Sequence, residues 1–378
     1  MRADGFDPGA LARLRAAFAE RVEAGRIPGA TWLLARAGAP AQIECVGRLD
    51  PARSAPMAPD AIFRIHSMTK PIVSAATLVL YEQGRLRLDD PVARYLPEFA
   101  QVRVGIEGDV APRPMTLHDL LRHTAGLTSE FLPPHPVRER YVQARPALRS
   151  RSNAEFASVL AGLPLMVAPG TRWEYSRATD LLGAVLEVIG GGSLGELLQA
   201  TVCGPLGMVD TGFFVAPAQR HRVAAPFERD PDRGAPVQLF DPLERPRFES
   251  GAAGLLSTVL DYGRFVRCLA EGGRLDGVRL LGRKTVAWMA SDHLGAIGHD
   301  ASILPPGYGF GLGVAVRTAP GLGSDPASVG SYGWSGMAGS IFVVDPAERL
   351  HAVLMVQAPG QAPELWDLFR SLVYAVLD

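Results

Sequence analysis

Lysine is nearly absent from this sequence: it occupies only positions 70 and 284, and arginine supplies every other basic side chain apart from histidine. Cysteine is scarce too, since Cys45, Cys203 and Cys268 are the only three and lie far apart. They form no CxxC pair and no zinc-like spacing, which predicts reduced thiols in a reducing compartment. We therefore expect neither a metal site nor a cofactor.

A charge excess of one sign and long apolar runs are missing as well. The formal net charge is −1 over 378 residues, which gives no sign of the basic surface typical of nucleic-acid-binding proteins. No run reaches the ~18 apolar residues of a membrane span, and residues 1–25 lack the pattern of a secretory signal. The sequence predicts a cytoplasmic protein without a nucleic-acid or membrane partner, and leaves its oligomeric state open.

Strand-like patterns gather at the two ends of the chain. Apolar residues recur at helical spacing over residues 11–22, and a terminal helix is expected over residues 366–377. Between these helices and the middle of the chain, strands are predicted at residues 30–37, 42–47, 62–65, 308–316, 339–344 and 350–356. A sheet built from both ends is therefore expected.

The middle of the chain has mainly helical patterns. Helices are predicted over residues 67–83, 117–122, 153–161, 180–189, 194–202, 261–270 and 283–290. Two stretches rich in proline and arginine, 130–151 and 216–247, interrupt them. We expect both to be long loops that line or cover a pocket, because loops of that length are uncommon without a function.

One of the two lysines follows a serine at a spacing that suits catalysis. Ser67 and Lys70 are three residues apart at the start of a predicted helix, so their side chains share one face. A desolvated lysine, unlike arginine, can lose its proton and then accept one from a nucleophilic serine. Free N–H groups at a helix start can stabilise an oxyanion. Chance alone gives roughly 0.1 such motifs in this chain, so the spacing by itself equally favours a helix-capping serine beside an exposed lysine.

Two further motifs could complete such a site. Tyr175, within Trp-Glu-Tyr-Ser-Arg, offers a phenol as a second proton carrier, although a lone tyrosine is more often a buried residue with a satisfied hydroxyl. The Gly-rich stretch from Trp334 through Gly336 and Met337 would let a ligand approach the backbone and offer a second oxyanion donor. The simpler interpretation of that stretch is a Gly-rich turn.

A competing serine motif must also be weighed. Residues 191–195 match the GxSxG nucleophile elbow, which requires a preceding buried strand. The preceding residues predict a helix instead, and Ser193 with Glu196 three residues later forms a helix-capping box. The histidines, including His66, His123 and His351, have no HExxH-like partner, and we expect them at helix ends or in the core.

The three motifs, in this order, resemble the β-lactamase-like serine hydrolases of the class C type, and most of all the family VIII carboxylesterases. Class A β-lactamases and penicillin-binding proteins carry a related set. The resemblance spans roughly residues 8–375. It implies an α+β fold in which an antiparallel sheet with flanking terminal helices, residues 1–75 and 300–378, adjoins a mainly helical domain, residues 76–299, across an active-site cleft.

The resemblance also implies residue roles. Ser67 would attack an acyl carbonyl, Lys70 and Tyr175 would share the proton transfers, and backbone N–H groups of Ser67 and Met337 would form the oxyanion hole. Water would then release the acyl group. The substrate would lie against a further set of residues, namely Trp334, Ser335, Gly336 and Arg177.

Two departures from the β-lactamase pattern bear on the substrate. Arg177 replaces the Asn of Tyr-x-Asn, and Trp334 replaces the Lys or His that helps to hold the carboxylate of a β-lactam. The loss of that cation favours small neutral acyl esters over penicillins. Arg177 is expected either to bind an acidic group of the substrate or to favour the deprotonated form of Lys70.

Alternatives to a carboxylesterase remain open from the sequence. They are an acyltransferase and a β-lactamase or D-amino-acid peptidase on the same fold, and a non-catalytic binding module of another class. The retention of Ser67, Lys70 and Tyr175 together argues against the binding module.

Overall fold

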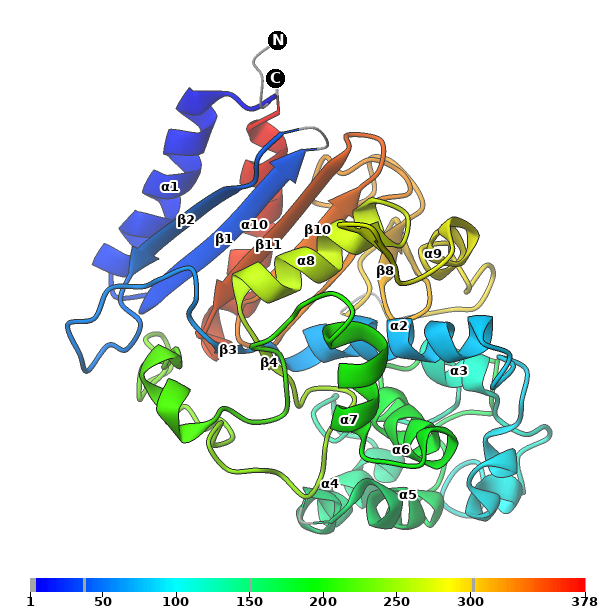
Figure 1. Ribbon diagram of the computed structural model, residues 1–378. Helices are drawn as coiled ribbons and strands as arrows, with labels where there is room; N and C mark the ends of the chain where they lie inside the picture. Colours follow the sequence, from blue (N-terminus) through cyan, green and yellow to red (C-terminus); the bar gives the residue numbers. More distant parts are fainter. Residues whose placement is uncertain (1–4, 37–38, 150, 301–302, 378) are drawn as a thin grey trace.

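A seven-stranded antiparallel sheet forms one half of the molecule (Figure 1) in the computed structural model, which describes residues 5–36, 39–149, 151–300 and 303–377. The strands lie in the order β2-β1-β11-β10-β9-β8-β7. Their bounds are β1 Gly29–Arg36, β2 Gln42–Gly47, β7 Tyr308–Phe310, β8 Ala315–Arg317, β9 Tyr332–Ser335, β10 Ile341–Asp345 and β11 Leu350–Val356. Because β1 pairs with β11, the two ends of the chain meet within one sheet, as expected for this α+β fold.

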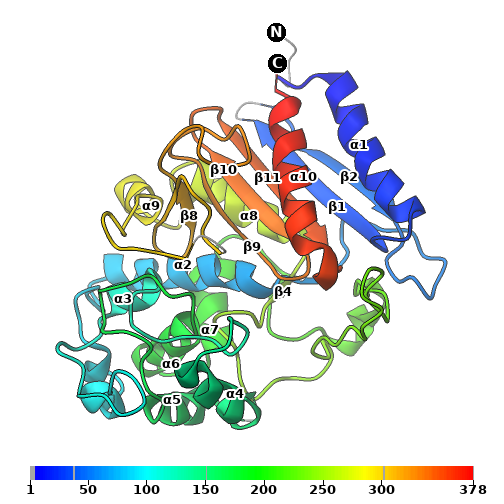
Figure 2. The same ribbon diagram turned by 180° about the vertical axis from the view of Figure 1, so that it is seen from behind.

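The terminal helices α1 (Pro8–Glu23) and α10 (Ala362–Ala375) lie side by side on one face of the sheet (Figures 1 and 2). The ring of Phe18 on α1 lies 5.3 Å from that of Trp32 and 6.3 Å from that of Phe369. Successive residues of a strand point to opposite faces, so Trp32 faces these helices while Leu33 belongs to the second, larger core. The sheet is therefore buried on both faces.

Helix α8 (Val259–Ala270) covers the other face of the sheet. It packs against β11, β10 and β1, and the ring of Tyr262 lies 5.5 Å from that of Phe342 on β10. Gly263 permits this approach, because a Cβ atom there would lie 2.8 Å from the side chain of Leu33. Helix α8 thus packs on the sheet, although its sequence lies inside the block 76–299 that is expected to be mainly helical.

The remaining helices form the second half of the molecule, shown below the sheet in Figure 1. Their bounds are α2 Thr69–Glu82, α3 Leu117–Leu121, α4 Pro136–Arg149, α5 Asn153–Ala161, α6 Ala178–Gly190 and α7 Leu194–Leu198, the last continued by a π-helical turn over Gln199–Cys203. Helix α9 (Arg283–Met289) lies beside the sheet. Two short antiparallel strand pairs complete the fold: β3 (Phe63–Arg64) with β4 (Leu256–Ser257), and β5 (Arg274–Leu275) with β6 (Val278–Arg279). The larger core runs without a break from the sheet into these helices.

Two expectations about local structure were wrong. The stretch 130–151 is not one long loop, because α4 occupies most of it. Residues 308–316 form a hairpin of β7 and β8 rather than one strand, because Gly313 takes a φ of +85° and turns the chain. Residue 37, the last of the strand predicted over residues 30–37, lies outside the described residues.

Within the described residues, no single helix has both the length and the apolar character needed to cross a membrane. One bent pair, α6 with residues Leu194–Cys203, passes that test together, with 78° between its two parts.

Candidate active site

Ser67 lies at a sharp turn between β3 and α2. His66 has a φ of +46°, in the left-handed region that few non-glycine residues adopt, and it begins the one-turn 3-10 helix His66–Met68. Helix α2 follows directly from Thr69. The nucleophile thus sits where a strand passes into a helix, with part of its side chain exposed.

Lys70 lies on the first turn of α2 and is almost completely buried, with 2% of its surface exposed. Its Nζ lies 3.2 Å from Ser67 Oγ and donates a 2.9 Å hydrogen bond to the carbonyl oxygen of Ala252. It also lies 4.6 Å from the centre of the Tyr175 ring, within the range of a cation–π contact. The spacing of Ser67 and Lys70 therefore does bring the two side chains together.

Tyr175 reaches Ser67 from the helical half of the molecule. Its hydroxyl donates a 2.8 Å hydrogen bond to Ser67 Oγ. It lies in a segment without regular secondary structure just before α6. Backbone hydrogen bonds tie that segment to the chain after α3, from Glu174 to His123 and from Gly170 to Thr124. Ser67, Lys70 and Tyr175 are thus in mutual contact although 108 residues separate the serine from the tyrosine.

A buried ion pair supports Tyr175 from the residue before it. Glu174 Oε1 accepts a 2.8 Å hydrogen bond from Arg138 on α4 and a 2.6 Å hydrogen bond from Thr128. Sequence reasoning missed Arg138 together with α4. The signal was present, because Pro136 suits the first turn of a helix and Val137 and Tyr141 follow at helical spacing, both buried.

Arg177 has a different setting from the one expected. Its Nε and Nη2 contact the carboxylate of Glu130, and its Nη1 lies 3.0 Å from Oδ2 of Asp180. Burial opposes the charged form, but Asp180 and Glu130 outweigh it and raise the pKa of Arg177 above its usual value. The guanidinium is therefore occupied by two protein carboxylates instead of facing a substrate group.

The third motif lies directly against the nucleophile. Trp334 and Ser335 end β9, and Gly336 approaches the backbone so closely that a Cβ atom there would lie 2.5 Å from the carbonyl oxygen of Ile65. Any other residue at 336 would push β9 away from the turn that carries Ser67. Met337 follows, with 56% of its surface exposed.

Aromatic rings surround the phenol of Tyr175. The Trp334 ring lies 5.6 Å from it, at the position where β-lactamases have a cation, and the rings of His123 and Phe131 lie at 4.8 and 5.8 Å. Burial, and then the positive charge of Lys70, hold the pKa of His123 well below its usual value. His123 is therefore a neutral core residue, in agreement with the expectation from the sequence.

The competing serine is a helix cap. Ser193 accepts a hydrogen bond from the backbone N–H of Glu196, whose side chain accepts one from the N–H of Ser193, and α6 precedes the motif where an elbow needs a strand. Among the described residues, no three His, Cys, Asp or Glu side chains gather so as to hold a metal ion.

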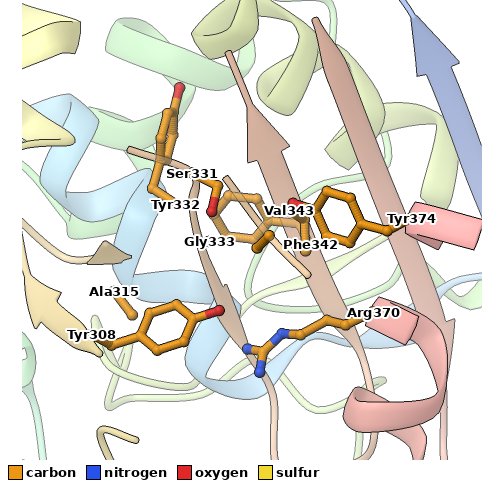
Figure 3. Close-up of a pocket in the computed structure, with 10 residues that line it drawn as sticks. Tyr308, Ala315, Ser331, Tyr332, Gly333, Phe342, Val343, Arg370 and Tyr374 are labelled. Atoms are coloured by element: carbon orange, nitrogen blue, oxygen red, sulfur yellow. The ribbon is translucent and has the colours of Figure 1, made fainter. Parts of the chain in front are cut away.

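A small cavity of about 20 Å³ lies apart from these residues, among β7 to β10 and α10 (Figure 3). Tyr308 and Arg370 line it, whereas Ser67, Lys70 and Tyr175 do not. Its volume suffices for about one water molecule, so it is too small for an acyl substrate.

Comparison with known proteins identifies the family of this chain. The family model described as Beta-lactamase matches residues 14–373. Esterase EstB of Burkholderia gladioli is 34% identical over 390 residues, covering 96% of this chain and 95% of its own. ML-236A carboxylate methylbutanoyltransferase mlcH of Penicillium citrinum is 28% identical, covering 97% and 94%.

A solved structure gives the same picture. EstCE1, described as a hydrolase with promiscuous acyltransferase activity, superimposes with a TM-score of 0.84 at 27% identity, covering 97% of this chain and 98% of its own. The resemblance inferred from the three motifs is confirmed. This chain belongs to the β-lactamase family, with the fold of serine hydrolases that include esterases and acyltransferases.

Proposed function

We propose that the protein is a carboxylesterase that cleaves small neutral acyl esters through an acyl-enzyme on Ser67. The observation that carries this proposal is the pair of contacts to Ser67 Oγ, 3.2 Å from Lys70 Nζ and 2.8 Å from Tyr175 OH. A nucleophile within hydrogen-bond reach of two proton carriers is the arrangement that covalent acyl transfer needs.

Acylation uses both carriers in turn. Ser67 Oγ attacks the ester carbonyl carbon while its proton passes to the neutral amine of Lys70. The backbone N–H groups of Ser67 and Met337 hold the resulting oxyanion. The C–O bond to the alcohol then breaks, the alcohol oxygen takes a proton from Tyr175, and Lys70 returns its proton to the phenolate.

Deacylation reverses these transfers with water in place of the alcohol. Water attacks the Ser67 ester carbonyl, gives one proton to the Lys70 and Tyr175 pair, and forms a second tetrahedral intermediate at the same oxyanion hole. Its collapse returns the proton to Ser67 Oγ and releases the carboxylic acid, so no net proton remains on the protein.

The side chains around Tyr175 support an uncharged substrate. Trp334 stands where a cation would bind a carboxylate, and Arg177 is occupied by Glu130 and Asp180. Phe131 and Met337, 63% and 56% exposed, offer apolar surface beside Tyr175 and the third motif. We propose that Trp334, Ser335 and Gly336 border the acyl or alcohol group.

Acyl transfer to an alcohol is the second candidate function. Two relatives that match nearly the whole chain support it: EstCE1 is a hydrolase with promiscuous acyltransferase activity, and mlcH is a methylbutanoyltransferase. The chemistry on Ser67 is the same in both cases, and only the acceptor that attacks the acyl-enzyme differs. β-Lactam hydrolysis is less favoured, because no cation stands at position 334.

A substrate panel tests the proposal. It contains p-nitrophenyl esters of graded acyl length, a chromogenic cephalosporin and a D-amino-acid amide, each with and without an added alcohol. We expect turnover of the short esters, little turnover of the other two, and labelling by a fluorophosphonate probe. Ester formation exceeding hydrolysis would instead identify an acyltransferase.

Two serine variants identify the nucleophile. Ser67→Ala should abolish both labelling and turnover, because it removes the hydroxyl that forms the acyl-enzyme. Ser193→Ala is the matched control: it removes a helix cap at a cost of about 1 kcal/mol of stability and should leave turnover unchanged. Labelling that survives in Ser67→Ala would refute the assignment.

A further inference from the structure

A short turn between the two halves of the molecule holds the Lys70 side chain. This turn, residues 250–253, passes close to the start of α6, where Gly251 comes so near that a Cβ atom there would lie 2.5 Å from the carbonyl oxygen of Thr179. After the turn, the N–H of Leu255 donates a 3.1 Å hydrogen bond to Oγ1 of Thr69, beside Lys70. The turn is thus anchored on α6 at one end and on α2 at the other.

The anchor on α6 is the carboxylate of Asp180, which is completely buried. Its Oδ1 accepts a 2.5 Å hydrogen bond from Ser250 Oγ and a 3.0 Å hydrogen bond from the N–H of Ala252. The same residue, Ala252, accepts the 2.9 Å hydrogen bond from Lys70 Nζ. Asp180 therefore holds the N–H of the residue whose carbonyl oxygen holds Lys70.

Arg177 and Glu130 make the buried charge of Asp180 tolerable. Arg177 lies between the two carboxylates, and Glu130 has a second, more distant cation in Arg145, at 3.7 Å. Two negative and two positive charges thus balance within this group. This ion pair accounts for the arginine at position 177, where β-lactamases have Asn, because an uncharged residue there would leave the carboxylate of Asp180 without its cation.

We infer that Asp180 is a positioning residue for the acylation step: through Ser250 and Ala252 it fixes the carbonyl that holds Lys70 Nζ against Ser67 Oγ. This inference rests on the proposed function, in which Lys70 accepts the serine proton. It assigns Asp180 no contact with substrate. Its effect is geometric, since a proton acceptor displaced by about 1 Å can lose about 10²-fold in rate.

Three variants test this role by the rate of fluorophosphonate labelling and by kcat and KM for a p-nitrophenyl ester. Asp180→Ala should lower labelling and kcat by about 10²-fold with little change in KM. Ser250→Ala removes one hydrogen bond of the turn and should lower kcat by roughly 3- to 10-fold. If Asp180→Ala does not fold, Ser250→Ala still tests whether the turn positions Lys70.

The double variant Asp180→Asn with Arg177→Gln is the rescue. The Asn oxygen can still accept from Ser250 and Ala252, the Gln oxygen can accept from the Asn amide, and neither is charged. It should recover most of the lost kcat. Failure to recover in a folded double variant would overturn the geometric role.

Asp345→Ala is the matched control. Asp345 is another completely buried carboxylate, and it holds a different turn of the chain. It accepts hydrogen bonds from the N–H groups of Ala347 and Glu348 and from the hydroxyl of Tyr374. It should lower the melting temperature and leave kcat unchanged. An equal fall of kcat in Asp345→Ala, or unchanged kcat in Asp180→Ala, would overturn the inference, whereas activity in Ser67→Ala would overturn the proposed function itself.

Discussion

Ser67 lies in the 3-10 turn that leads into α2 and Lys70 in the first turn of α2, whereas Tyr175 lies outside any helix or strand. Twelve consecutive residues of α2, from Thr69 to Leu80, are buried, and such a helix is fixed by packing on every side. Tyr175 instead lies between two buried ion pairs, Arg138 with Glu174 and Arg177 with Asp180.

The difference shows two ways of fixing a catalytic side chain. Apolar packing has no preferred partner atom, so a helix can be buried by many sequences. Hydrogen-bonded ion pairs are directional, and a buried ion pair that loses one partner leaves an uncompensated charge behind. We therefore expect the serine and lysine half of the site to depend on the chemistry of Lys70 itself, and the tyrosine half to depend on partners distant in sequence.

The largest expected effect comes from Lys70→Arg. Arginine keeps its proton and cannot accept one from Ser67, so kcat should fall by about 10³-fold, and the longer side chain must also fit a site that is 2% exposed. Steady-state kinetics with a p-nitrophenyl ester measure this loss, and circular dichroism reports whether α2 remains folded.

The other lysine provides the control for this substitution. Lys284 on α9 is exposed, so Lys284→Arg should leave both kcat and stability unchanged. If Lys70→Arg retained more than a tenth of the activity, the proton acceptor would have to be another group. The serine and lysine half of the site would then supply only the nucleophile.

The same contrast explains how much the sequence could predict. Periodic segments were located well: β2 and α5 have the expected bounds, and the cap at Ser193 was recognised from Glu196 three residues later. The pattern of Ser67 and Lys70 is local too, because residues three positions apart are neighbours on the surface of a helical turn.

What the sequence could not predict depends on contacts between distant segments. No local pattern states that Arg177 would meet Glu130, or that Asp180 would hold residues some 70 positions away. Helix α4 was missed because its arginines and prolines resemble those of a loop, although Val137 and Tyr141 are buried at helical spacing. The position of α8 on the sheet likewise depends on which core its apolar face meets.

An intermediate effect is expected from Arg138→Met, which breaks the ion pair before Tyr175. Glu174 would keep only the hydroxyl of Thr128 as a donor while 3% exposed, and leaving a buried charge without its partner costs about 3 kcal/mol. Displacement of Tyr175 should lower kcat roughly tenfold, given the sensitivity of such sites to geometry. Urea denaturation and ester kinetics measure the two effects.

A second substitution separates charge from shape in this prediction. Adding Glu174→Gln to Arg138→Met removes the uncompensated charge and should restore much of the stability. If Arg138→Met left both stability and kcat unchanged, directional contacts would not be what holds the tyrosine half, and the contrast between the two halves would fail.

The smallest expected effect on activity lies in the sheet. Burial lowers the pKa of His351 on β11 to about 4, with Glu271 opposing and Arg267 adding to the shift. Because this lies below the ordinary value near 6.5, the unfolded chain takes up the proton first as the pH falls. The free energy of unfolding should thus decrease from about pH 6.5 to about pH 4, by about 3 kcal/mol for this residue.

His351→Gln removes that titration and should leave kcat at pH 7.5 unchanged, because the side chain lies in the apolar-packed sheet away from Tyr175 and its ion pairs. Urea denaturation at pH 7.5 and 4.5 should show a smaller loss of stability than in the original protein, with proton uptake on unfolding reduced by about one. His118→Gln gives the comparison in the helical half: the pKa of His118 is also lowered to about 4, chiefly by burial, but its imidazole is partly exposed, so its effect should be smaller. A pH dependence that survives unchanged in His351→Gln would contradict this prediction, because the acid sensitivity would then come from groups other than His351.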